Sequence, residues 1–163
     1  MQNDGEREPV KSDDEEPIVL TTEAVIEERY SDGSVERFHH HPNGGGMVSH
    51  LAEVSRTAYV DLYSWVRGRA KVLDSARLED GAAVYDNAVI AGEACISGGA
   101  RVSDNAVVRG CATVIGQDAH VGDDAIVEGD AKVAGLTWVM GTTRLETGVH
   151  KDVGTIGRDA SLS

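Results

Sequence analysis

The chain of 163 residues is poor in aromatic residues, cysteine and proline. Aromatic residues make up 4% of it, with a single phenylalanine, while all hydrophobic residues amount to 40%. A core must therefore consist mainly of small aliphatic side chains. Two cysteines, Cys95 and Cys111, do not make a disulfide framework and favour free thiols in a reducing compartment. No apolar run approaches the ~20 residues needed to span a bilayer, and the acidic N-terminus does not resemble a signal peptide, so we expect a cytoplasmic protein without membrane contact.

Basic residues are also in the minority. The chain has 15 lysines and arginines against 28 acidic residues, which gives a net charge of −13. Because nucleic-acid binders normally present a basic face, direct nucleic-acid binding is not expected. Residues 1–45 carry a net −8, residues 46–141 a net −5 and residues 142–163 a net zero.

The first 45 residues divide into two parts. Residues 1–17 are rich in charge and nearly lack aliphatics, so we predict a disordered acidic tail. In residues 18–45, aliphatic runs over 18–30 and 35–38 flank a turn signal at 31–34, which predicts a β-hairpin. His39, His40 and His41 begin a Gly-rich loop. Three histidines could bind a metal, but without a carboxylate or cysteine at a fixed spacing a solvated loop is favoured.

From residue 46 to residue 141 the sequence repeats every six residues. A small residue is followed two positions later by an aliphatic residue, and Gly or Asp usually comes two positions after that. The small residues are Ala52, Ala58, Ser64, Ala70, Ala76, Ala82, Ala88, Ala94, Ala100, Ala106, Ala112 and, after a one-residue slip, Ala119, Ala125, Ala131 and Thr137. The aliphatic residues include Val54, Val60, Val66, Val72, Leu78, Val84, Ile90, Ile96, Val102, Val108, Val114, Val121, Val127, Val133 and Val139.

This period predicts an all-β fold. A six-residue spacing would walk around a helix, whereas positions two apart share one face of a strand. Gly and Asp tolerate the tight bend that must follow each short strand. We therefore predict a single-stranded parallel β-helix, or solenoid, of about five coils over residues 46–141. The hairpin of residues 18–45 would cap one end, and residues 142–163 would form a cap or tail at the other.

The repeat resembles the hexapeptide-repeat left-handed β-helix, the fold of trimeric acyltransferases related to UDP-N-acetylglucosamine acyltransferase. Residues 115–125, Ile-Gly-Gln-Asp-Ala-His-Val-Gly-Asp-Asp-Ala, are closest to the aliphatic-Gly-x-x-Ala-x unit of that family. Units such as residues 100–105 look more like simple repeat arrays of uncharacterised bacterial and phage proteins. The resemblance implies left-handed coils with three sides each and a symmetric trimer.

Three hexads per coil would stack residues 18 apart in outward columns. One column holds Val89, Val107 and Ile126, with Leu73 beside it. Apolar side chains stacked on an outer face indicate an interface between copies, in a trimer or in a dimer, although plain strand propensity also favours valine and isoleucine. The interface residues are predicted to be Leu73, Val89, Val107 and Ile126.

Polar candidates are fewer. Asp86, Asp104 and Asp123 stack at one corner and could share a cation, but the preference of Asp for turns explains them better, so we predict no metal. His120 is the one catalytic candidate, as a general base near Arg101 and Trp138, against the alternative of an ordinary surface histidine. The chain lacks the extruded loop and the histidine set that the family's enzymes use, so no functional residue carries over and no cofactor is expected.

Three functions follow. The favoured one is a non-catalytic solenoid that acts as an oligomeric scaffold or protein-interaction surface, for example as a phage accessory or virion protein in the host cytoplasm. The second is an acyltransferase-like enzyme with a site between subunits. The third is an acidic mimic of nucleic acid that inhibits a DNA-binding protein, which is weakened because most of the negative charge precedes residue 46.

Overall fold

The computed structural model describes residues 25–157, and every regular element in that part is a β-strand. Sheet 1 contains β1 (Ile26–Arg29), β2 (Val35–His40), β3 (Met47–Ser49), β6 (Trp65–Val66), β9 (Ala83–Val84), β12 (Arg101–Val102), β15 (His120–Val121), β18 (Thr137–Val139) and β21 (Gly154–Ile156). Sheet 2 contains β4 (Glu53–Val54), β7 (Lys71–Val72), β10 (Val89–Ile90), β13 (Val107–Val108), β16 (Ile126–Val127) and β19 (Arg144–Leu145). Sheet 3 contains β5 (Tyr59–Val60), β8 (Arg77–Leu78), β11 (Cys95–Ser97), β14 (Thr113–Ile115), β17 (Lys132–Ala134) and β20 (Val149–Lys151). A helix long and apolar enough to cross a membrane does not occur among these residues.

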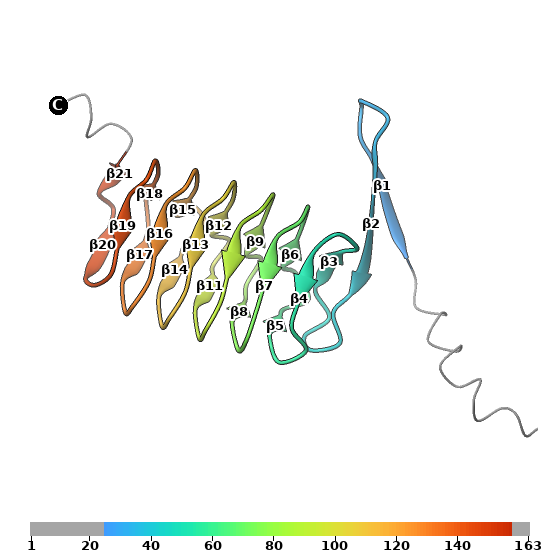
Figure 1. Cartoon of the computed structure of the whole chain (residues 1–163), viewed down its shortest axis with the longest axis horizontal. Helices are drawn as coiled ribbons and strands as arrows, with labels where there is room; N and C mark the ends of the chain where they lie inside the picture. The colour runs from blue at the N-terminus through green and yellow to red at the C-terminus, as the bar shows by residue number, and fades with distance from the viewer. Residues whose placement is uncertain (1–24, 158–163) are drawn as a thin grey trace, which may run out of the picture.

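The chain winds through the three sheets in turn, so each circuit contributes one short strand to each sheet. Strands of successive coils pair in parallel with a register of 18 residues, as in Val89 opposite Val107. Six strands in each of sheets 2 and 3 give six coils, and Figure 1 shows them stacked along the long axis. The prediction of a parallel β-solenoid is confirmed, with one coil more than expected.

The core is a ladder of the two inward positions of each hexad. The alanines and the aliphatic residues two positions after them are fully buried through the middle coils, for example Ala88 with Ile90 and Ala106 with Val108. Large rings are absent from this ladder because facing strands in a narrow prism leave room only for an alanine beside a branched aliphatic. The six-residue period therefore identified the buried positions.

The corners require residues that tolerate left-handed backbone. At the corner between sheets 2 and 3, Gly92 and Gly110 have φ of 71° and 74°. A Cβ atom on Gly92 would lie 3.0 Å from the backbone N and O atoms of Gly110 in the next coil. At the corner between sheets 1 and 2, aspartates adopt the same conformation. Glycine is therefore needed where backbones of adjacent coils almost touch, and aspartate serves elsewhere.

An antiparallel hairpin of β1 and β2 extends sheet 1 at the N-terminal end, and β2 pairs antiparallel with β3. Arg67 fixes it to the solenoid: its guanidinium donates to both carboxylate oxygens of Glu28, at 2.7 and 3.0 Å, and lies over the rings of Phe38 and Trp65. The hairpin prediction is confirmed for the described residues, whereas the predicted tail at 1–17 and the aliphatic run at 18–20 lie outside them. The strand expected over 18–30 is described only from Ile26 to Arg29.

Two expectations need correction. His39 and His40 lie in β2, and His41 is 4% exposed with its Nε2 3.0 Å from the Ala58 carbonyl oxygen, so the histidines are not a solvated loop. The coils also continue past residue 141, because β19, β20 and β21 pair with β16, β17 and β18. The sequence period faded there because Gly148 and His150 take the places of the small and aliphatic residues.

Candidate functional site

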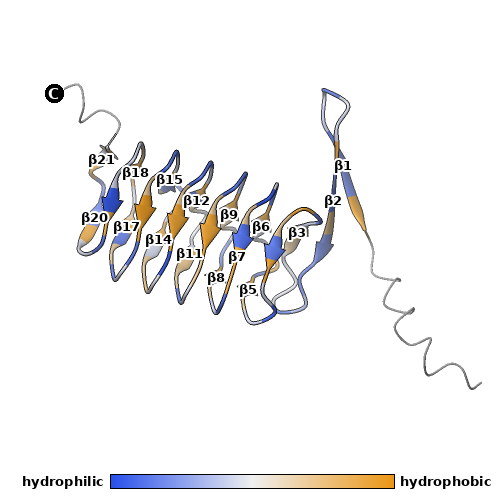
Figure 2. Cartoon of the chain, viewed as in Figure 1, coloured by the Kyte–Doolittle hydropathy of each residue, from blue (hydrophilic) through white to orange (hydrophobic). Residues whose placement is uncertain are grey.

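We refer to the outer surfaces of sheets 1, 2 and 3 as faces 1, 2 and 3. The pairing register places on face 2 the column that the sequence predicted: Val89 pairs with Val107, and Val107 pairs with Ile126. All three side chains are half-buried in the single chain, as is the neighbouring Leu73. In Figure 2 the arrows of β13 and β16 are orange between the blue arrows of β7 and β19. The structure therefore brings the four predicted interface residues together as an apolar stripe on face 2.

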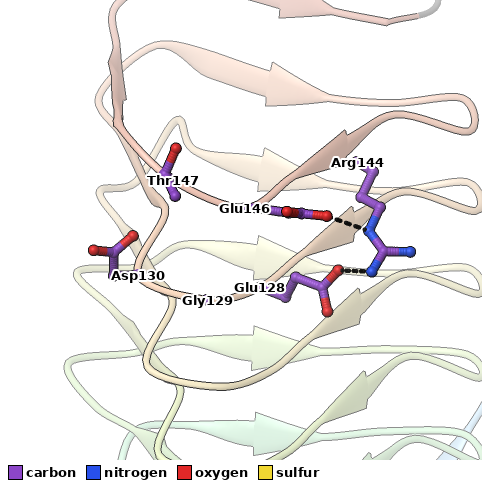
Figure 3. Close-up of a pocket in the computed structure, with 6 residues that line it drawn as sticks. All are labelled: Glu128, Gly129, Asp130, Arg144, Glu146 and Thr147. Atoms are coloured by element: carbon purple, nitrogen blue, oxygen red, sulfur yellow. Dashed lines mark hydrogen bonds and ion pairs between the residues drawn. The ribbon is translucent and has the colours of Figure 1, made fainter.

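Ion pairs bound this stripe at both ends. At the N-terminal end, the Lys71 Nζ lies 3.1 Å from a carboxylate oxygen of Glu53. At the other end, Glu128 accepts from Arg109 at 2.8 Å and also pairs with Arg144, which bonds Glu146 at 3.0 Å (Figure 3). These arginines hold the pKa of Glu128 below its usual value, mainly through the Arg109 hydrogen bond.

Asp86, Asp104 and Asp123 form a column at the corner between sheets 1 and 2. Their φ values are 59°, 61° and 56°. Each carboxylate Oδ2 accepts a backbone N–H from the next coil: Asp86 from Asp104 at 3.3 Å, Asp104 from Asp123 at 3.1 Å and Asp123 from Gly141 at 2.9 Å. This geometry gives the carboxylates a structural task at the turn. No group of three or more possible metal ligands occurs within residues 25–157.

His120 lies outward on face 1 between Arg101 and Trp138, as the stacking predicted. Its Nε2 is 3.2 Å from the Ser103 Oγ, and that hydroxyl donates to the Asp104 Oδ2 at 2.9 Å. Burial lowers the pKa of His120, against a smaller opposing influence of Asp104. A neutral imidazole joined to a carboxylate through a hydroxyl could accept a proton. Sequence reasoning missed Ser103, because only the coil register brings it beside His120.

Two adjoining depressions lie on face 1, and both are lined by Arg101 and Gln117. The first, of about 470 Å³, also contains Tyr63, Trp65 and Tyr85. The second, of about 240 Å³, contains His120, Leu136 and Trp138.

The one-residue slip in the repeat falls at the corner that precedes β15. Gln117 and Asp118 of that corner line the second depression. The backbone carbonyl of Asp118 accepts a hydrogen bond from Trp138 Nε1 at 3.0 Å. The slip was visible in the sequence and was the one signal for this depression.

The cysteines are unactivated. Burial raises the pKa of Cys95, and a hydrogen bond to the Glu93 carboxylate raises that of Cys111. Both thiols therefore stay protonated near neutral pH, and neither is suited to act as a nucleophile.

Comparisons with known proteins found no match, whether to a family model, to a curated protein or to a solved structure. The geometry of faces 1 and 2 is therefore what the functional argument rests on.

Proposed function

We propose that this protein is a non-catalytic β-solenoid of the left-handed hexapeptide-repeat type that acts as an oligomeric scaffold. Copies of the chain associate through face 2 and leave the other faces for a protein partner. A phage accessory or virion component in the host cytoplasm would suit such a rod.

The apolar stripe of Leu73, Val89, Val107 and Ile126 carries this proposal. Three branched aliphatic side chains stacked on an outward column have no role in the core of their own chain. Association would bury them and release water from their surfaces, which is favourable.

The ion pairs at both ends support the same role. A stable interface between proteins has an apolar centre and a polar rim. Face 2 has that arrangement, with the Lys71–Glu53 pair at one end and the Glu128–Arg144–Glu146 cluster at the other. A closed trimer is the form that the resemblance implies, and a two-fold dimer would also cover the stripe.

Light scattering coupled to gel filtration tests the proposal. The unmodified chain should have the mass of a trimer or dimer, and Val107→Lys should reduce it to a monomer because a charge would be buried at the centre of the interface. Val149→Lys is the matched control, since Val149 lies outward on face 3 and is 69% exposed. A monomeric unmodified chain, or an oligomer unaffected by Val107→Lys, would contradict the proposal.

The contacts of His120 favour a second candidate, an acyltransferase-like enzyme with a site between subunits. His120 would serve as the general base, oriented by Ser103, which Asp104 holds in turn. Turnover of acetyl-CoA with a panel of acceptors, compared with His120→Ala, tests it. The absence of transfer and hydrolysis would rule this candidate out. The acidic-mimic hypothesis stays a prediction, tested by whether a basic partner is captured at low salt and lost at high salt.

A further inference from the structure

The rare aromatic residues gather on face 1. The chain has two tryptophans and four tyrosines, and both tryptophans together with Tyr63 and Tyr85 line the two adjoining depressions. Tyr63 is 72% exposed and Trp138 is 47% exposed. Strand propensity alone would distribute exposed rings over all three faces, so their concentration on one face needs another explanation.

These rings are held in place before any ligand arrives. Trp138 donates its indole N–H to the Asp118 carbonyl oxygen, and its ring lies 5.8 Å from that of His120. Trp65 packs edge-on against Phe38 at 5.3 Å and carries the Arg67 guanidinium over its ring at 4.4 Å. Rigid aromatic surfaces lose little conformational freedom when a ligand stacks on them.

The polar groups among the rings are mixed in sign. Arg101 and Gln117 offer hydrogen-bond donors to both depressions, while Asp80 lines the first depression and Asp118 the second. Hydroxyl groups both donate to carboxylates and accept from guanidinium and amide groups. A polyanion would instead be repelled by the two aspartates and by a chain of net charge −13. The set therefore fits a neutral, polyhydroxylated ligand better than a nucleotide or nucleic acid.

The depressions run along the axis of the solenoid. Trp65 and Trp138 are joined by the register Trp65–Ala83–Arg101–His120–Trp138, which is four coil steps. At the spacing of strands in a sheet, four steps span about 19 Å. Small or flat residues such as Ala83, Gly81 and Gly99 lie between the rings and leave the path open. An extended ligand of several rings fits this path better than one small molecule.

We propose that face 1 binds a neutral oligosaccharide laid along the coil axis, with the apolar faces of its sugar rings on the aromatic side chains and its hydroxyls bonded to Arg101, Gln117, Asp80 and Asp118. This site lies on a different sheet from the stripe on face 2. An oligomeric scaffold would therefore present several copies of it at once, which raises the strength of binding to a polymeric glycan.

Binding of the full-length chain to an array of neutral and acidic oligosaccharides tests the proposal, followed by titration of the neutral sugars that bind. Both tryptophans of the chain lie at the site, so their intrinsic fluorescence reports the titration directly. Trp138→Ala and Tyr63→Ala should each weaken binding about tenfold, because each removes one stacking surface. Tyr59→Ala, which removes an outward ring on face 3 beneath Arg77, is the control and should leave the affinity unchanged.

Thermal unfolding of each variant confirms that the fold is retained, and Tyr63→Phe shows whether the ring or the hydroxyl contributes. No neutral sugar bound on the array would overturn the proposal. So would affinity that is the same in Trp138→Ala, Tyr63→Ala and Tyr59→Ala, or stronger binding of an oligonucleotide such as (dT)10 than of any neutral sugar.

Discussion

Faces 1 and 2 surround the same core and are built from strands of the same length, yet they carry different side chains. Face 2 presents aliphatic residues in one column, bounded by ion pairs at both ends. Face 1 presents rings, a histidine and hydrogen-bonding groups around two depressions. Because the inward positions repeat almost unchanged, any function of the solenoid must arise from the outward positions, where each face can vary separately.

A cavity in the shared core should affect both faces most strongly. Ile96 is fully buried on β11. Ile96→Ala should lower the free energy of unfolding by about 2–5 kcal/mol, through lost burial and the cavity left behind. Urea unfolding followed by circular dichroism measures this loss. Ile115→Ala, at an outward position that is 44% exposed, should change stability by less than about 0.5 kcal/mol. Equal effects of the two variants would contradict the inward ladder.

Removing the Arg67 clasp should disturb face 1 and leave face 2 intact. Arg67→Ala removes the paired hydrogen bonds to Glu28 and the contacts with Phe38 and Trp65. We expect a loss of about 1–2 kcal/mol, since the pair is partly exposed. Hydrogen exchange should become faster at β1 and β2 and stay unchanged at β13. Arg67→Lys should behave nearly like the alanine variant because it lacks the planar fork. Faster exchange throughout the solenoid would show that the clasp is not local.

The corner between the two faces offers a smaller perturbation. Asp104 combines a left-handed backbone with a hydrogen bond from the Asp123 N–H. Asp104→Ala should cost about 1–2 kcal/mol, because alanine is strained at positive φ and cannot accept that bond. Asp104→Asn should be nearly neutral in urea unfolding, since asparagine tolerates the conformation and keeps an acceptor oxygen. If the asparagine variant were as unstable as the alanine variant, the carboxylate charge would be the important feature.

The mildest effect should come from pH and should involve face 1 rather than face 2. Burial lowers the pKa of His120 and of His41 below the ordinary value of 6.5. The unfolded chain then binds protons more readily than the folded one, so their contribution to stability is complete above pH 6.5 and is lost as the pH falls below it. The urea midpoint should therefore decrease between pH 7.5 and 5.5. His120→Gln should make that decrease smaller, and a midpoint that rises on acidification would show the sign to be wrong.

The sequence predicted the core and the columns because both follow directly from a period of six. Val89, Val107 and Ile126 could be placed in one column by counting 18 residues along the chain. Ser103 beside His120 and Arg67 on Glu28 could not be found that way, since side-chain orientation and the position of the hairpin depend on packing. The sixth coil was missed because Gly148 and His150 break the pattern while the backbone continues to pair.

The separation of the two faces is tested most directly by light scattering on Val107→Lys and Trp138→Ala, measured side by side with the unmodified chain. Face 2 as the interface predicts that Val107→Lys has the mass of a monomer while Trp138→Ala keeps the mass of the unmodified oligomer. If Trp138→Ala dissociates while Val107→Lys remains assembled, association occurs through face 1 and the functions assigned to the two faces are wrong.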